Sequence, residues 1–365
     1  MRTPLVIASA VLALQIGAAP AQANQEQIVA EIDAIVAKLD GGEIDENQAI
    51  EALREAIPRP GNFPTRVVEY VVPSGAGGGS DTYARMIGHD AARIMGRSIA
   101  YNNMGGGGGQ IALAYAVNQE PDGYTVYGTW AAQIIQCAVG GYQHCVATEM
   151  VPVIQNQGAT EAFFVRGDSP FETWDDLIGY ARENPGRIRV AGAGAMGDDE
   201  LNVAYINNEL DLRIAYFPFD EPGQRFGALL GGHVEVLYGT IGTVLDLIRD
   251  EQIRPVLLVT NEGSPEIDAF VPGGGTVPGA HDVGLEFPIT RFRGIWTVPG
   301  TDPEIVDYLH NVLYASSQLP RYRNYEREAM MHLTRGYRNT EEFGAYSNRV
   351  IENLRPVLKE LGYIE

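Results

Sequence analysis

The spacing of apolar residues near the start of the chain predicts two short amphipathic helices. Apolar side chains recur every three or four positions between 28 and 39, and the pattern resumes between 50 and 57 after Gly41-Gly42. Pro58 and Pro60 end the second run, because proline lacks the amide hydrogen that a helix interior needs. We therefore expect residues 24–60 to form a helical extension outside the main core.

Downstream of the extension, β-rich runs alternate with segments of helical spacing. The predicted strands cover residues 66–72, 98–101, 124–127, 163–165 and 187–191. The predicted helices cover residues 83–95, 111–117, 174–183, 303–313 and 343–361, the last with a kink expected at Pro356. Strands that alternate with helices indicate an α/β architecture with largely parallel sheets.

Glycine-rich loops follow three of these strands, at 74–81, 105–109 and 192–197. In the first loop, glycines without a Cβ atom allow successive N–H groups to turn toward a carboxylate, and the next helix adds its positive dipole end. This pattern favours an anion site. Ser80 or Asp81 also stands where a helix cap belongs, so the acid is open to a second interpretation in which it accepts only the helix's own N–H groups.

The third loop, Gly192-Ala-Gly194-Ala-Met-Gly197, matches the dinucleotide fingerprint G-x-G-x-x-G and has the required strand before it and helix after it. Three acids follow at once, Asp198-Asp199-Glu200, where a pyrophosphate would have to approach the helix. Because like charges repel there, we interpret the loop as a turn that lets the strand meet the helix.

Charge and composition exclude several functional classes. The 365 residues, 45% of them hydrophobic, suffice for two domains of about 150 residues each. Lys+Arg number 26 against 47 Asp+Glu, a net charge of −21, so no nucleic-acid partner is expected. Lysine occurs only at positions 38 and 359, which disfavours Schiff-base, pyridoxal-phosphate and P-loop chemistry. The six histidines are scattered and no catalytic motif is present, so we expect neither an enzyme nor a cofactor.

The first 23 residues have the layout of a signal peptide. Arg2 is followed by an apolar stretch over residues 5–19 and by the small-residue site Ala21-Gln22-Ala23. An uncleaved anchor helix is disfavoured because Gln15 and Gly17 interrupt the stretch. We expect export to the periplasm and a soluble mature chain.

Cys137 and Cys145 lie eight positions apart and flank Gly140-Gly141. In an oxidising compartment this spacing predicts a disulfide. Metal ligation together with His144, or a reactive thiol, are the alternatives.

Several segments in sequence order resemble the Bug-type extracytoplasmic solute receptors of tripartite tricarboxylate transporters. The first segment, VEYVVPSGAGGGSDTYAR at 68–85, is similar to the first strand and loop of that family. Further similar segments follow in order: NNMGGGGGQIA at 102–112, PDGYT at 121–125, GT at 128–129, SPFETWDDLIGYARENPG at 169–186, LLGGHVE at 229–235 and VPGTDPEIVDYL at 298–309.

The resemblance implies a type II periplasmic binding protein, with two α/β domains joined by crossover strands and a ligand cleft between them. Domain 1 would comprise residues 61–160 and 287–365, and domain 2 residues 161–286. Such a protein is a non-catalytic receptor, expected to be a monomer, that closes on a small organic acid and delivers it to the membrane subunits of a transporter. The hinge strands would lie near 155–165 and 285–295.

The candidate ligand-binding residues come from the first glycine loop and from the family pattern. They are Gly77, Gly78, Gly79, Ser80, Asp81, Thr129, Gly194, Phe219, Asp220 and Thr240. Where the family has Pro-Tyr-Lys-Gly, this chain has Pro-Phe-Asp-Glu at 218–221, so an acid replaces a lysine. With the acids at 198–200, this predicts an acidic, solvated cleft rim. We therefore expect a carboxylate ligand whose other end is cationic or rich in hydroxyls, rather than a plain di- or tricarboxylate, with a bound cation as a further alternative.

Two other functional classes remain open at this point. One is an exported Rossmann-type enzyme that uses the loop at 192–197. The other is a receptor-like sensor whose partner is a signalling protein.

Overall fold

The computed structural model describes residues 18–193, 195–219, 222–271 and 275–365, and it divides into two compact units after Pro58. In the N-terminal unit, α1 (Ala18–Asp40) and α2 (Glu46–Ala56) lie against each other. Asp45 caps α2 by accepting the backbone N–H of Gln48 at 2.9 Å. Both helices were predicted, although α1 begins inside the segment interpreted as a signal peptide. Among the described residues, no helix is both long enough and apolar enough to span a membrane.

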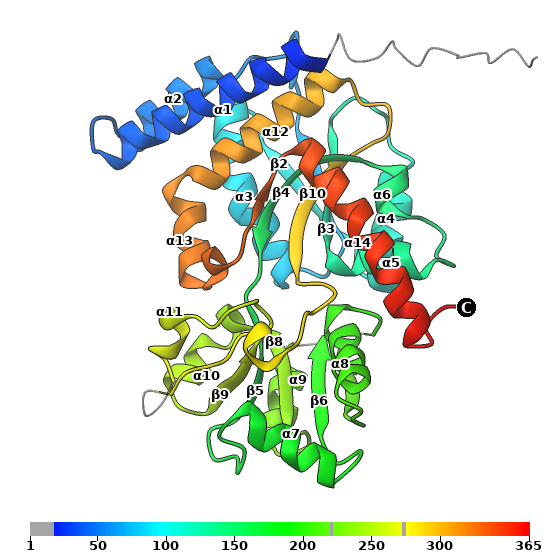
Figure 1. Cartoon of the computed structure of the whole chain (residues 1–365). Helices are drawn as coiled ribbons and strands as arrows, with labels where there is room; N and C mark the ends of the chain where they lie inside the picture. Colours follow the sequence, from blue (N-terminus) through cyan, green and yellow to red (C-terminus); the bar gives the residue numbers. More distant parts are fainter. Residues whose placement is uncertain (1–17, 194, 220–221, 272–274) are drawn as a thin grey trace, which may run out of the picture. The chain divides into compact units, whose positions relative to one another are not determined.

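The second unit contains two β-sheets, shown in Figure 1. The first sheet has the strand order β11-β4-β10-β3-β1-β2. Its strands are β1 (Val68–Val72), β2 (Ile99–Asn103), β3 (Thr125–Trp130), β4 (Val151–Gly158), β10 (Phe292–Thr297) and β11 (Tyr337–Arg338). The second sheet has the order β7-β6-β8-β5-β9. Its strands are β5 (Glu161–Arg166), β6 (Arg189–Ala193), β7 (Ala215–Phe219), β8 (Val236–Thr240) and β9 (Ile253–Leu258).

Helices connect the strands of both sheets (Figure 1). The helices between or after strands of the first sheet are α3 (Gly79–Met95), α4 (Gln110–Ala116), α5 (Ala131–Val139), α6 (Val146–Glu149), α12 (Pro303–Gln318), α13 (Pro320–Glu328) and α14 (Thr340–Glu360), with the short turns η1 (Gly107–Gly109) and η4 (Met331–Leu333). Those after strands of the second sheet are α7 (Trp174–Glu183), α8 (Asp198–Glu209), α9 (Pro222–Leu230), α10 (Leu245–Arg249) and α11 (Pro265–Asp268), with η2 (Ile241–Thr243) and η3 (His281–Val283).

The prediction of largely parallel sheets is wrong, because both sheets are mixed. The pairs β1–β2, β1–β3, β6–β7 and β6–β8 are parallel. Every antiparallel pair involves β4, β5 or β10. These three strands flank the two places where the chain passes between the sheets, so they run against the neighbouring strands that belong to βαβ units.

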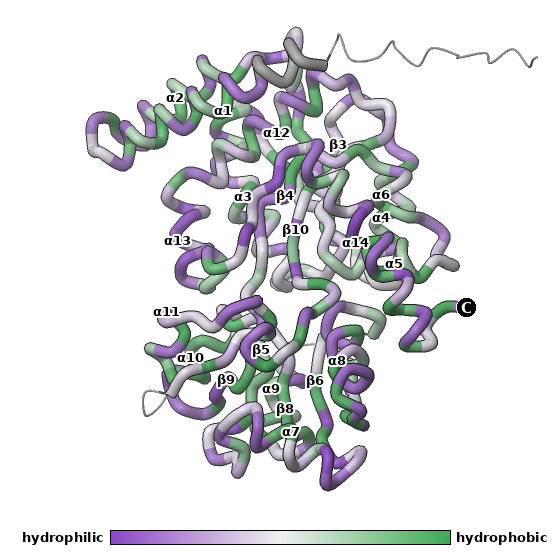
Figure 2. Tube along the Cα trace, viewed as in Figure 1, coloured by the Kyte–Doolittle hydropathy of each residue, from purple (hydrophilic) through white to green (hydrophobic). Residues whose placement is uncertain are grey.

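Apolar side chains between each sheet and its helices form the core. Hydrophobic clusters of described residues lie beside the first sheet and on the second. In Figure 2 the hydrophobic colour follows β8 and β9, while α13 is strongly hydrophilic. Burying one face of each helix in this way supplies most of the stabilisation of the fold.

The chain crosses between the sheets at residues 159–160 and again between β9 and β10. The two crossings lie side by side, because the N–H of Ala159 donates to the carbonyl of Arg291 at 3.0 Å. In the first sheet, β4 ends at the same edge as β1 and β3. In the second sheet, β5 begins beside Thr240, the last residue of β8. The crossing at 159–160 therefore joins the carboxyl edges of the two sheets, which is where α/β proteins place their ligands.

Candidate functional site

The first glycine loop leads from β1 into the N-terminus of α3. The helix cap is Gly78, which has no side chain to accept a hydrogen bond, so Ser80 and Asp81 lie within the first turn and not at the cap. Gly77 adopts a φ of +79°, a conformation that glycine permits at low cost. Because no side chain caps this end of the 17-residue helix, its first N–H groups face outward as donors for an anion.

Asp81 holds the glycine loop in place. It accepts the N–H of Gly77 at 2.9 Å, the side-chain amide of Asn103 at 3.0 Å and the guanidinium of Arg85 at 3.0 Å. Burial opposes the charged form, but the hydrogen bonds from Arg85 and Gly77 outweigh it and lower the pKa of Asp81. The carboxylate is thus fully engaged in positioning the loop.

Arg293, which the sequence interpretation missed, lies directly beneath this loop. It sits in β10, is 8% exposed, and donates from Nη1 to Oε1 of Gln157 at 2.5 Å. A Cβ atom at Gly79 would stand 2.7 Å from its Nη2, so a larger residue here would displace the guanidinium. Among the described residues no carboxylate pairs with Arg293, and its Nε has no hydrogen-bond acceptor. A buried, uncompensated guanidinium therefore points at the start of α3.

Thr129 belongs to a hydrogen-bonded network at the end of β3. Its hydroxyl donates to Oε1 of Gln133 at 3.1 Å, and the same oxygen accepts the N–H of Trp130 at 2.8 Å. The amide of Gln133 donates to the carbonyl of Gly108 in the second glycine loop at 2.9 Å. The end of β3 and two glycine loops thus meet at one edge of the first sheet.

The candidate residues of the second sheet lie at its carboxyl edge. Phe219 is the last residue of β7 and is half-buried, while Thr240 is the last of β8 and is 5% exposed. Phe219 pairs with Ala193, the last residue of β6. The candidates Gly194 and Asp220, together with Glu221, lie outside the described residues.

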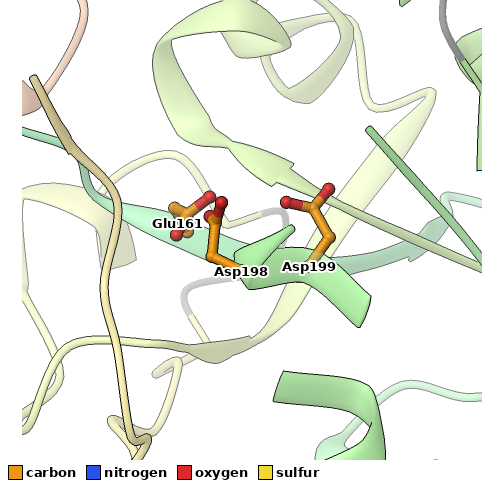
Figure 3. Close-up of side chains that lie close together, drawn as sticks. All are labelled: Glu161, Asp198 and Asp199. Atoms are coloured by element: carbon orange, nitrogen blue, oxygen red, sulfur yellow. The ribbon is translucent and has the colours of Figure 1, made fainter. Parts of the chain in front are cut away.

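The prediction of an acidic, solvated rim is wrong for Asp198 and Asp199, both of which are 0% exposed. Figure 3 shows them with Glu161 near the start of α8. Nη2 of Arg291 lies 2.9 Å from Oδ2 of Asp198, and its Nε lies 3.4 Å from Oε1 of Glu161. Nη2 also donates to Oδ1 of Asp199.

Arg225 adds a second guanidinium, with Nη1 3.7 Å from Asp199. The sequence interpretation could not find this pairing, because Asp199 and Arg291 are 92 positions apart.

The electrostatics identify this cluster as a structural ion-pair network. Burial raises the pKa of Glu161 well above its usual range and that of Asp199 to about 6. Burial also acts to lower the pKa of Arg291, but the neighbouring carboxylates outweigh it and raise that pKa. Three acids share two guanidinium groups, so the cluster is neutral when one carboxyl keeps its proton. Arg291 and Arg225 already supply the positive charge that a metal ion would bring.

The described residues of the loop at 192–197 argue against a pyrophosphate site. Asp199 accepts the N–H of Ala193 at 2.6 Å, and Glu200 accepts that of Met196 at 2.7 Å. A Cβ atom at Gly192 would meet the ring of Tyr216 at 2.4 Å. The glycine serves the packing of strand and loop, and two of the loop's N–H donors are taken by the chain's own carboxylates.

The predicted disulfide is present. Cys137, in α5, is bonded to Cys145, with a Cα–Cα distance of 5.1 Å. His144 is engaged elsewhere, because its Nδ1 lies 2.8 Å from a carboxylate oxygen of Glu149.

Curated proteins of similar sequence are bacterial. The UPF0065 protein in gbd 5'region of Cupriavidus necator is 25% identical over 308 residues, which cover 82% of this chain and 89% of that protein. Protein BugT of Bordetella pertussis is 25% identical over 254 residues, covering 68% of this chain and 75% of BugT.

Solved structures show the same fold of two α/β domains. MatC from Rhodopseudomonas palustris with bound malate aligns with a TM-score of 0.70 at 22% identity, over 81% of this chain and 100% of MatC. The periplasmic binding protein BugD aligns with a TM-score of 0.70 at 21% identity, over 83% of this chain and 99% of BugD. Residues 83–362 match the family described as tripartite tricarboxylate transporter family receptor. The chain therefore belongs to this receptor family, as its glycine loops and ordered motifs indicated.

Proposed function

We propose that this protein is a non-catalytic receptor that captures a small carboxylate and delivers it to the membrane subunits of a tripartite transporter. Arg293 carries the proposal. An unpaired charge that is buried this deeply costs a folded protein about 3 to 5 kcal/mol. A bound carboxylate would supply the counter-charge that the described residues do not.

The surroundings of Arg293 suit one carboxylate group. Nη2 of Arg293 and the uncapped end of α3 meet at Gly79. The helix end favours an anion by about 0.3 to 1 kcal/mol, and each charge-assisted hydrogen bond adds about 1.5 to 3 kcal/mol. Gly77, Gly78 and Ser80 would complete the contact through the loop backbone, with Thr129 nearby.

The identity of the ligand's other end depends on the second domain. Asp198 and Asp199 are paired with Arg291, so they do not repel a second carboxylate as the sequence suggested. Two related structures are named with malate and with adipate, which are small dicarboxylates. This supports including dicarboxylates among the proposed ligands. A cationic or hydroxyl-rich end remains part of the proposal through Asp220 and Glu221, while Phe219 and Thr240 would line the same side.

A thermal-shift and calorimetry panel tests the proposal. It contains mono- and dicarboxylates including malate and adipate, amino acids and uncharged sugars, each with and without a chelator. We expect Arg293→Gln to weaken carboxylate binding by about 10- to 150-fold, the equivalent of one charge-assisted hydrogen bond. Arg66→Gln is the matched control, because Arg66 pairs with Asp122 at the surface. Stabilisation by uncharged compounds alone, or an unchanged affinity in Arg293→Gln, would contradict the proposal.

The other end of the ligand is tested by Asp220→Lys. If Asp220 faces a cationic group, this variant loses affinity for amino acids and gains affinity for plain dicarboxylates. Equal effects on both ligand classes would remove Asp220 from the site.

We propose that binding closes the two domains about the crossings near 155–165 and 285–295. The hydrogen bond between Ala159 and Arg291 supports this, since it makes the two crossings one narrow connection. Small-angle scattering should show a smaller radius of gyration at saturating ligand. An unchanged radius would argue against closure.

We further propose that the receptor works in the periplasm after removal of residues 1–23. The layout of those residues supports export. Osmotic-shock fractionation should release the processed protein, whereas a chain that lacks residues 2–23 should stay in the cytoplasm. The same location of both chains would refute the role of the leader.

A further inference from the structure

A second concentration of positive charge lies apart from Arg293, in a cavity of about 520 Å³ beside the first sheet. Its walls come from the end of α12, from α13, and from the segment that runs through η4 to β11. None of the candidate ligand-binding residues that the structure describes lines it. The cavity is therefore not explained by the proposed carboxylate site.

The lining of this cavity is strongly basic. Its described lining includes Arg323, Arg327, Arg335 and His332 but one carboxyl, that of Glu326. Burial raises the pKa of Glu326 to about 7, so even this acid carries less than a full negative charge near neutral pH. In a chain with a net charge of −21, such a local excess of cations is unusual.

Arg335 and His332 each have a carboxylate partner outside the lining of the cavity. Nη2 of Arg335 lies 3.1 Å from Oε1 of Glu342, and Nε2 of His332 lies 2.9 Å from Oε2 of Glu266. Both pairs are exposed to solvent, where an ion pair contributes little to stability. Within the part of the chain that the structure describes, Arg327 has no carboxylate partner.

Asn156 provides a second, independent sign of a ligand. It lines the cavity and is 4% exposed. Its Oδ1 accepts the hydroxyl of Tyr83 and its carbonyl accepts that of Tyr322, but its Nδ2 has no acceptor among the described residues. A buried amide donor without an acceptor destabilises the protein, and a ligand oxygen would satisfy it.

We propose that this cavity binds a small oxyanion, with phosphate or carboxylate groups, at a site separate from Arg293. Guanidinium groups bind both the planar carboxylate group and the tetrahedral phosphate group through paired hydrogen bonds to their oxygens. The amide of Asn156 and the side chains of Ser317 and Gln318 would supply further donors.

Calorimetry on the full chain tests the site with two probes, inorganic phosphate and citrate, at matched ionic strength. We expect Arg327→Gln and Arg323→Gln each to weaken binding at least tenfold. Arg321→Gln is the matched control, because Arg321 lies exposed on the same helix but does not line the cavity. Glu326→Gln should tighten binding several-fold, since it removes the one carboxyl among the described lining residues.

The outcomes separate this site from the proposed receptor site. Tighter binding of phosphate than of citrate would assign a phosphate ligand to the cavity. Tighter binding of citrate would assign a carboxylate ligand. Binding that persists in Arg293→Gln supports a separate site even if that variant binds its carboxylate normally. Loss of probe binding in Arg293→Gln, equal weakening by Arg321→Gln, or no binding of either probe would overturn the inference.

Discussion

Two arginines two positions apart, one just before β10 and one within it, have opposite surroundings. Arg291 and Arg293 are 6% and 8% exposed, so each has lost most of its contact with water. Arg291 meets three carboxylates, those of Glu161, Asp198 and Asp199. Arg293 meets the neutral amide of Gln157.

The difference shows how one residue type serves two purposes. A buried cation with acidic partners is part of the structure, and its removal leaves the partners uncompensated. A buried cation without acidic partners is unfavourable to the folded state by itself, so its retention suggests a partner from outside. The contrast predicts that stability depends on Arg291 and ligand affinity on Arg293.

The largest expected effect is on stability. Arg291→Gln should lower the free energy of unfolding by about 3 to 5 kcal/mol, because it leaves three carboxylates buried without their main cation. Arg293→Gln, the matched change two residues away, should lower it by less than about 1 kcal/mol or raise it. Urea unfolding of both variants measures the difference. Similar losses in the two variants would break the comparison.

A pH series on Asp199→Asn sharpens the assignment of the Arg291 cluster as structural. Burial raises the pKa of Asp199 to about 6, above its unfolded value of 3.8. The folded state therefore holds this proton more tightly, and the group's contribution to stability is lost as pH rises from about 4 to 6. Asn does not titrate, so the variant should gain about 3 kcal/mol relative to the parent across that range. A constant difference at all pH values would show that Asp199 is not the titrating group.

The disulfide offers a change in stability away from both arginines. Cys137→Ser with Cys145→Ser should lower the free energy of unfolding by about 2.5 kcal/mol, the loop-entropy value for a short closed loop. Carboxylate affinity should stay within twofold of the parent, because neither cysteine touches Arg293. A large loss of affinity would mean that any destabilisation weakens binding, and Arg293→Gln could then not be interpreted alone.

The smallest expected effect concerns the N-terminal extension. Deleting residues 24–60, with the chain restarting at Gly61, should leave ligand affinity unchanged, since the deleted segment supplies none of the candidate loops. Calorimetry on the deleted and full mature chains measures this. A folded deletion variant that no longer binds would move the extension into the site.

Local patterns predicted much of the framework. The helix at 174–183 has the predicted bounds, and Asp302 caps α12 as its position before Pro303 indicated. The disulfide also follows from the local spacing of the two cysteines and the expected oxidising compartment. These features depend on neighbours within a few positions along the chain, where propensity, capping and loop closure act.

The long-range partners were not predictable in the same way. The run Asp198-Asp199-Glu200 indicated a repulsive rim, and no nearby residue signals that Arg291 neutralises two of its members. Arg293 had no motif at all, because its meaning comes from Gln157, 136 positions away, and from the glycine loop.

The sequence by itself thus determined the alternation of several strands and helices, the glycine loops at the strand ends, the disulfide and the family resemblance. Tertiary structure alone decided that the sheets are mixed, that the acids of α8 are buried, and which of two neighbouring arginines lacks an acidic partner. The physical reason is that periodicity and capping act between residues close in sequence. Burial and charge compensation depend instead on which distant side chains the fold brings within a few ångströms.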